Sequence, residues 1–174
     1  MTNHAYFNLS AGQTETITEH LLQVNSSFYL PLNEDFVPQG TFNPVEKTDF
    51  DFTLPKHVGK VLASKDSQIV LAGGIDHEFL VLSSLKPVVR CEEPNTGRVL
   101  EIYTSEPAVH IYTGNFLQSG QSDKRGITFQ KYSGLAFETQ HFSDSVHHKN
   151  FPSVLLTPGQ QYFSETKYCF SVKS

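Results

Sequence analysis

The first residues of the chain combine an amide, an imidazole and two aromatic rings. Asn3, His4, Tyr6 and Phe7 follow one another with one intervening alanine. Histidine is the only side chain whose unperturbed pKa lies near neutrality, so His4 is a candidate proton-transfer group. Tyr6 and Phe7 offer an apolar wall against which a sugar ring stacks, with Asn3 beside it. The alternative is a terminal strand in which His4 is an ordinary polar residue.

Two carboxylates stand in unusual settings. Glu138 lies inside the strand-like stretch 135–140, where burial would raise its pKa toward the range useful to a general base. The alternative is an edge-strand glutamate that faces water. Asp76 precedes His77 and follows a double glycine at 73–74, so a turn is expected to present it at the start of a strand. His4, Asp76 and Glu138 are predicted to converge on one cavity.

Other ionisable residues do not form a recognisable metal or nucleophile motif. His141, His147 and His148 lack the regular spacing of a metal site, so no metal is expected. Cys91 and Cys169 lack CxxC spacing, which predicts neither zinc binding nor a disulfide framework. No phosphate-binding glycine loop and no nucleophile elbow is visible.

Length and charge narrow the class of protein. A chain of 174 residues is expected to form one domain. Its formal charge of −5 is spread without runs of one sign, which excludes nucleic acid and anionic membranes as expected partners. No apolar run is long enough to span a bilayer, and the first residues lack a signal-peptide pattern. We therefore expect a soluble protein of the cytoplasm with reduced cysteines.

Composition and turn signals predict an all-β domain. The chain holds 14 Phe and 7 Tyr, and Gly and Pro punctuate it at short intervals. More than half of the residues are expected in strands, with one or two short helices at most. Residues 56–68 are the expected helical stretch. Strands are expected at 21–30, 49–52, 69–72, 78–82, 88–91, 98–104, 109–113, 135–140 and 162–172.

Several ordered motifs together resemble one family, the aldose 1-epimerases or galactose mutarotases. The resemblance spans nearly the whole chain, and the specific side chains recur in order. The matching stretches are 2–9 (TNHAYFNL), 29–31 (YLP), 37–40 (VPQG), 49–52 (DFDF), 74–79 (GIDHEF), 96–100 (TGRVL), 112–116 (YTGNF), 137–140 (FETQ) and 150–153 (NFPS).

The resemblance implies a fold, a reaction and roles for the residues. The fold is the antiparallel β-sandwich called the galactose mutarotase-like supersandwich, whose open face interconverts the α and β anomers of a hexose in hexose metabolism, without cofactor or metal. Glu138 matches the family's base and His4 its acid, while Asp76 matches the carboxylate that holds sugar hydroxyls. Asn3 and Tyr6 are expected to line the same sugar site. This agrees with the chemistry of hemiacetal opening, which needs a base at the anomeric hydroxyl and an acid at the ring oxygen.

The chain departs from the family pattern in three ways. After the strand that bears Glu138, members often carry Trp-Pro-Asp-Ala, whereas residues 142–145 read Phe-Ser-Asp-Ser and keep only the acid and an aromatic. His110 stands where members usually carry a glutamine; it keeps one hydrogen-bond donor or acceptor there and is expected on the rim of the site. Members are also much longer, and their first half supplies an Asn-Arg motif and a further histidine. Residues 1–174 are therefore expected to be the C-terminal portion of such a domain.

Three functions stay open on the sequence. The chain is an aldose 1-epimerase, a carbohydrate-binding module without turnover, or an inactive truncated fragment with exposed strand edges. For the enzyme, galactose or glucose is the expected substrate. A sugar phosphate is not expected, because Arg98 is the only basic residue within the motifs. The chain alone is expected to be a poor catalyst, since part of the family's site is missing.

Overall fold

The computed structural model describes residues 1–118, 120, 122, 124 and 126–173, and its strands form two antiparallel sheets. The six-stranded sheet has the order β1 (Tyr6–Phe7), β10 (Leu135–Gln140), β9 (Ala108–Tyr112), β6 (Asp76–Leu80), β3 (Phe28–Tyr29) and β4 (Asn43–Pro44). The five-stranded sheet has the order β11 (Thr166–Val172), β8 (Arg98–Thr104), β7 (Val89–Glu93), β2 (Leu21–Val24) and β5 (Lys56–His57). The expected all-β, antiparallel class is confirmed.

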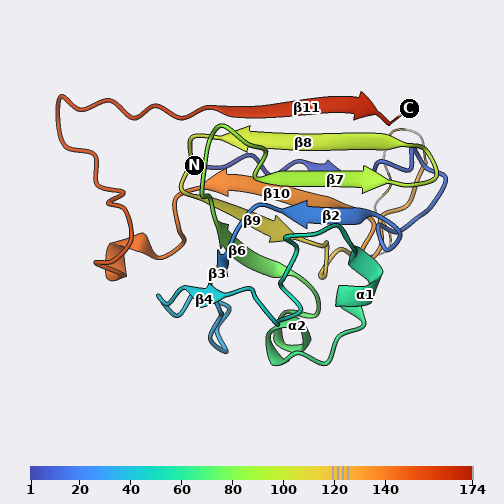
Figure 1. Ribbon diagram of the computed structural model, residues 1–174, viewed down its shortest axis with the longest axis horizontal. Coiled ribbons are helices and arrows are strands. Elements are labelled where there is room, and N and C mark those ends of the chain that lie inside the picture. Colours follow the sequence, from blue (N-terminus) through green and yellow to red (C-terminus); the bar gives the residue numbers. More distant parts are fainter. Residues whose placement is uncertain (119, 121, 123, 125, 174) are drawn as a thin grey trace.

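The two sheets pack face to face around one hydrophobic core. Figure 1 shows β8, β7 and β2 lying across β10, β9 and β6, with the helices at one end. Leu22, Leu100 and Ile102 of the five-stranded sheet share the core with Ile111 and Phe137 of the six-stranded sheet. All five side chains are fully buried. Burial of apolar surface between the layers therefore holds the six-stranded sheet in place.

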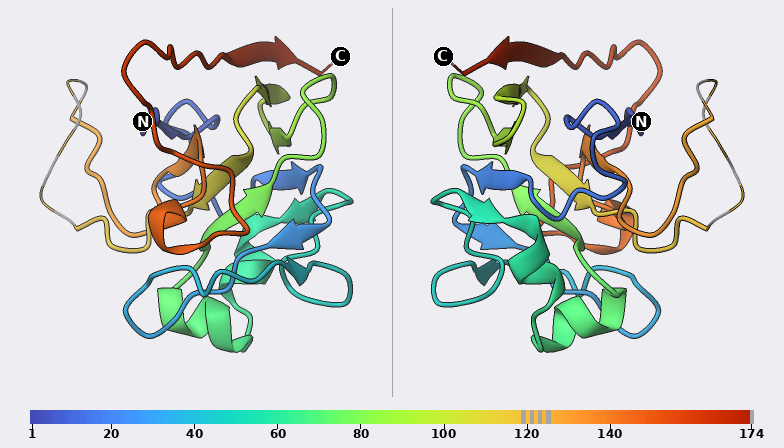
Figure 2. Two further views of the ribbon diagram at one scale, coloured as in Figure 1. Left: turned by 90° about the vertical axis from the view of Figure 1, so that its left-hand side faces the viewer. Right: turned by 90° about the vertical axis from the view of Figure 1, so that its right-hand side faces the viewer.

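The end views show how the rest of the chain surrounds the sheets. In Figure 2 both helices lie on the same side as β4, while the segment leading to β11 passes outside the sheets. The helices and the 3₁₀ turn are α1 (Val58–Leu62), α2 (Ser67–Ala72) and η1 (Ser145–His147). The helix expected within residues 56–68 is thus confirmed as α1.

The strand expected at 69–72 is wrong, because these residues belong to the helix α2. The Asp66 side chain accepts a hydrogen bond from the Gln68 N–H at 2.8 Å and caps the start of the helix. Gly73 ends it in the left-handed conformation with φ of 65°. Capping signals at both ends therefore outweigh the short apolar run, which alone does not distinguish a strand from a buried helical turn.

Further expectations about strands are wrong. Residues 49–52 form turns and extended chain, where Phe50 N–H donates to the Thr48 hydroxyl and Asp51 accepts from Thr53 N–H. Such local side-chain bonds compete with a sheet ladder. The rings of Phe50 and Phe52 are nonetheless in the core, as expected. Strands also cover well under half of the described residues. The strand expected at 21–30 is interrupted between Leu21–Val24 and Phe28–Tyr29, and the one expected at 162–172 begins only at Thr166.

Neither cysteine forms a disulfide, and Cys91 is buried. Among the described residues, no helix has the length and apolar character needed to cross a membrane.

Candidate active site

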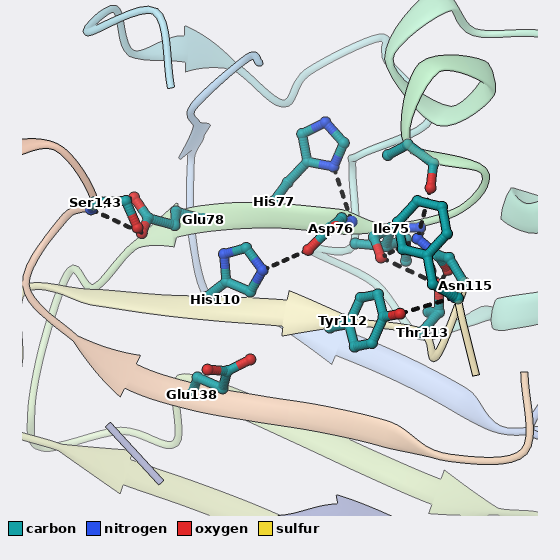
Figure 3. A network of polar contacts seen from close by, with 12 residues as sticks. Ile75, Asp76, His77, Glu78, His110, Tyr112, Thr113, Asn115, Glu138 and Ser143 are labelled. Atoms are coloured by element: carbon teal, nitrogen blue, oxygen red, sulfur yellow. Dashed lines mark hydrogen bonds and ion pairs between the residues drawn. The ribbon is translucent and has the colours of Figure 1, made fainter. Parts of the chain in front are cut away.

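Strand register gathers polar side chains on one surface of the six-stranded sheet. Glu78 of β6 pairs with His110 of β9, which pairs in turn with Glu138 of β10. Asp76 pairs with Tyr112 one step along the same surface. Because alternate residues of a strand face the same side, all five side chains lie on one face, which we call the polar face (Figure 3). The other face packs into the core.

His4 and Glu138 meet on the polar face although they lie near opposite ends of the chain. His4 Nε2 is 3.2 Å from Glu138 Oε1, and the side chains are 47% and 10% exposed. β1 pairs antiparallel with β10 and so brings the preceding residues alongside Glu138. Burial raises the pKa of Glu138 and the carboxylates of Asp76 and Glu78 add to this, while His110 and His4 oppose it. Glu138 is therefore a carboxylate suited to taking a proton.

Asp76 and His110 form a second histidine–carboxylate pair beside the first. His110 Nε2 is 2.7 Å from Asp76 Oδ1, and the two side chains are 20% and 22% exposed. Burial alone would lower the pKa of His110. The hydrogen bond to Asp76 and the charges of Asp76, Glu78 and Glu138 outweigh burial, so the pKa of His110 is raised. The pair therefore places a histidine whose protonated form is favoured beside a carboxylate acceptor on the polar face.

Aromatic rings form a wall beside His4. The His4 ring lies 4.9 Å from the ring of Tyr6 and 6.2 Å from that of Tyr112. Tyr112 stacks on Phe116 at 6.5 Å, and its hydroxyl accepts the Phe116 N–H at 2.8 Å. Tyr6 and Phe116 are 46% and 58% exposed. These rings offer apolar faces to a bound molecule while Tyr112 is held in place.

The start of β6 is fixed by a buried network. The Asn115 side-chain amide donates to the carbonyls of Ala72 and Ile75, at 2.9 Å and 3.0 Å. Gly74 has φ of 148°, and a Cβ there would lie 2.2 Å from Asn115 Oδ1. Only glycine allows this approach. These hydrogen bonds hold the turn before β6 against the segment that follows β9, and so fix the position of Asp76.

His77 supports the same strand from the core side. Its Nδ1 accepts the backbone N–H of Asp76 at 3.1 Å, and its Nε2 lies 3.2 Å from Gln68 Oε1. This pairing requires a neutral ring with the proton on Nε2. Burial, with the nearby charge of His110, lowers the pKa of His77 to about 3. His77 is therefore a structural residue of the strand that carries Asp76.

Most of the predicted site residues lie on the polar face, and one of them makes only a local hydrogen bond. His4 contacts Glu138, and Asp76 lies on the same face, bonded to His110. Their convergence on one cavity stays a prediction. Asn3 does not bond to any of them: its Oδ1 accepts the Ala5 N–H at 3.1 Å and turns the chain next to His4. Among the described residues, no cluster of His, Cys, Asp or Glu is placed to hold a metal ion.

The fold and motifs agree with one family of enzymes. The family model described as Aldose 1-epimerase matches residues 1–169. The chain belongs to the aldose 1-epimerase family.

Relatives of known name show the same membership. Galactose mutarotase of Homo sapiens is 39% identical over 99% of this chain, and aldose 1-epimerase of Haemophilus influenzae is 34% identical over 98%. The chain spans 49% and 50% of these relatives, or about half of their length. A crystal structure of a GalM/aldose epimerase homologue from C. elegans matches with a TM-score of 0.86 and 31% identity, covering 99% of this chain and 51% of that one. The fold is thus the galactose mutarotase-like sandwich.

This member of the aldose 1-epimerase family also has residues on the polar face that were not among the predicted site residues. Glu78 is 1% exposed and accepts hydrogen bonds from Ser143 and Gln140. Tyr112 lies between His4 and Phe116. Both could have been found from the strand period, since Glu78 follows Asp76 by two positions, as Tyr112 follows His110. Ser143 lies in an irregular segment, where no periodic signal exists.

Proposed function

We propose that this chain carries the acid–base centre of an aldose 1-epimerase, which interconverts the α and β anomers of a hexose by opening and closing its ring. One observation carries the proposal: His4 Nε2 and Glu138 Oε1 approach to 3.2 Å on an open surface. A hemiacetal carbon bears both the hydroxyl that must lose a proton and the ring oxygen that must gain one. Two such groups side by side can serve both oxygens of one carbon.

The proposed sequence of proton transfers uses the two groups in turn. Glu138 takes the proton of the anomeric hydroxyl while His4 gives a proton to the ring oxygen, and the bond from the anomeric carbon to that oxygen breaks. Rotation about the neighbouring carbon–carbon bond turns the other face of the aldehyde to the ring hydroxyl. Closure then runs the same transfers in reverse, so both groups return to their starting states.

The neighbouring side chains are assigned to holding the sugar. Asp76 and His110 offer an acceptor and a donor to hydroxyl groups, and Tyr6 offers a ring face for stacking. The names of the relatives, galactose mutarotase and aldose 1-epimerase, support an aldose such as galactose as the substrate, and glucose is the other hexose that we propose. We place the reaction in hexose metabolism in the cytoplasm, to which two free cysteines are suited.

Sugar binding with little or no turnover is the second candidate. It is favoured by the 47% exposure of the His4 side chain and by the chain's span of about half the length of its relatives. A general acid or base contributes about 10²- to 10⁴-fold, and only when the substrate is held in reacting geometry. We therefore expect the 174-residue chain alone to be a poor catalyst.

Polarimetry with fresh α-D-glucose and α-D-galactose tests the proposal. The chain is measured alone and joined to the half of human galactose mutarotase that it does not match, each beside its Glu138→Gln variant. We expect acceleration over buffer in the joined form that Glu138→Gln abolishes. NMR titration of the chain with either sugar should shift the signals of His4 and His110. Sugar-induced shifts without turnover in either form would favour the binding module. The absence of both turnover and sugar-induced shifts would contradict both candidates.

A further inference from the structure

Glu78 is a buried carboxylate in the middle of the polar face that the proposed reaction does not use. It is 1% exposed and stands in one cross-strand row with His110 and Glu138. An ionised carboxylate in such a place is costly unless donors surround it. Its donors are the Ser143 N–H at 2.9 Å, the Ser143 hydroxyl at 2.6 Å and the Gln140 amide at 3.0 Å.

These hydrogen bonds connect strands that are not neighbours. Glu78 belongs to β6, whereas Gln140 ends β10 and Ser143 follows it, and β9 lies between the two strands. Figure 3 shows the Ser143 segment reaching Glu78 beyond the end of β10. Glu78 therefore fixes the course of the chain immediately after the strand that carries Glu138.

Glu78 is the cross-strand partner of His110 on the polar face, and no hydrogen bond joins the two side chains among the described residues. The groups around His110 are Asp76 and Glu78 of β6, Glu138 of β10 and, through the sheet, the neutral ring of His77. His110 Nε2 is hydrogen-bonded to the Asp76 carboxylate, and within the described residues His110 Nδ1 makes no hydrogen bond. Since all the donors that bond Glu78 are neutral, its charge is not cancelled by a direct ion pair and acts on the imidazolium.

We propose that Glu78 is a positioning residue of this site: it anchors the chain after β10 and places a negative charge beside His110, which favours an Nδ1 proton that His110 can offer to a sugar oxygen. That the ligand is a sugar rests on the proposed function, whereas the coupling between Glu78 and His110 does not depend on it. A purely structural Glu78 would hold Ser143 and Gln140 but leave the protonation of His110 unchanged.

The test follows the titration of His110 by NMR in the wild-type chain, in Glu78→Gln and in Ser143→Ala. Glu78→Gln keeps the shape but removes the charge, so the titration midpoint of His110 should fall by about one pH unit. Ser143→Ala removes hydrogen bonds but keeps the charge, so the His110 midpoint should stay close to the wild-type value. An unchanged midpoint in Glu78→Gln would overturn the proposal, as would an equal fall in both variants.

A second variant without the charge covers the case in which Glu78→Gln does not fold. Glu78→Met has a similar length and also removes the charge, so it should lower the titration midpoint of His110 by a similar amount. Glu101→Gln, on the five-stranded sheet, is the matched control and should leave that midpoint unchanged. A His110 midpoint that is the same in Glu78→Met and in the wild type would overturn the proposal.

These titrations need neither sugar nor turnover, so their outcome is separate from that of the proposed function. Where the protein turns over a sugar, Glu78→Gln should raise KM more than it lowers kcat, because His110 is assigned to binding. A fall in kcat with KM unchanged would contradict that assignment, even if the titrations agree.

Discussion

Two histidines lie on the polar face and two lie in the interior, and the two regions give the imidazole ring different partners. On the polar face, His4 and His110 each meet a carboxylate, Glu138 and Asp76 respectively. In the interior, His20 accepts the Leu9 N–H at 2.9 Å, and His77 bonds to a backbone N–H and an amide. Partner charge, and not burial alone, separates the two regions.

The difference shows how a sheet uses one residue type for chemistry and for packing. Burial lowers the pKa of His20 to about 4 and that of His77 to about 3, so both rings are neutral at physiological pH. The pKa of His110 is raised in spite of burial, because carboxylates surround it. The pKa of a histidine is thus raised where hydrogen-bonded and nearby carboxylates outweigh burial, as for His110, and lowered where burial outweighs a nearby carboxylate, as for His20 beside Glu93.

The largest expected effect comes from removing the base of the polar face. Glu138→Gln keeps the shape of the side chain but cannot take a proton, so mutarotation by the joined form should fall by about 10²- to 10⁴-fold. Polarimetry measures the loss. Glu101→Gln, on β8 of the other sheet, is the control and should keep full activity. Equal activity of the two variants would remove Glu138 from the mechanism.

Lowering the pH should reduce the free energy of unfolding through the two interior histidines, His20 and His77. Their folded pKa values lie below the ordinary value of about 6.5, so the unfolded chain binds protons first and stability falls as the pH drops below about 6.5. Between pH 7 and 5 each ring should cost about 2 kcal/mol of unfolding free energy. Urea unfolding of wild type and His77→Gln at both pH values isolates the share of His77.

A control at a residue without an ionisable side chain completes this experiment. His77→Gln should lose roughly half of the combined His20 and His77 pH dependence, whereas Gln13→Asn, at an exposed position, should not alter it. Parallel pH curves for wild type and His77→Gln would mean that His77 takes up its proton over the same pH range in the folded and the unfolded chain.

Removing the acid should affect catalysis and leave stability nearly unchanged. His4 is 47% exposed and precedes β1, so His4→Ala should change the free energy of unfolding by less than about 0.5 kcal/mol. Mutarotation by the joined form should nevertheless fall by about 10²-fold. Thermal unfolding and polarimetry on one preparation give both numbers. A large loss of stability would instead make His4 a structural residue.

Asp76→Asn should make His110 resemble the interior histidines. Without the carboxylate the pKa of His110 should fall, since burial is then opposed only by Glu78 and Glu138. Loss of the charged hydrogen bond should cost about 1–2 kcal/mol of unfolding free energy. NMR titration and urea unfolding measure the two effects, with Asp35→Asn in an exposed loop as control. An unchanged His110 titration would show that Asp76 does not stabilise the imidazolium.

The central strands could be predicted from the sequence, and the irregular segments could not. β8 and β10 have the expected bounds of 98–104 and 135–140, because turn residues flank these apolar stretches. The helix α2 was missed because an apolar run of a few residues has no distinguishing period. Phe50 and Phe52 were expected in the core but on a strand, since alternation also occurs in turns held by side-chain bonds.

The site shows the same limit. Family motifs singled out His4, Asp76 and Glu138, and the structure brings them together. The role of Glu78 depends on Ser143, which approaches it from an irregular segment. Contacts of this kind depend on the path of a loop across neighbouring strands, and no period or spacing in the sequence encodes that path.

β1 holds the acid of this site through a short strand pairing. The strand is joined to β10 by two residue pairs, Tyr6 with Ala136 and Phe7 with Leu135, whereas β10 pairs with β9 along its length from Ala136 to Gln140. Opening of the short pairing requires far less free energy than global unfolding. In such an opened state Glu138 stays on its sheet and His4 leaves it. The rate of amide exchange at Phe7 would therefore report how often His4 separates from Glu138. On heating, the proton-transfer activity should be lost at a lower temperature than that at which the core unfolds.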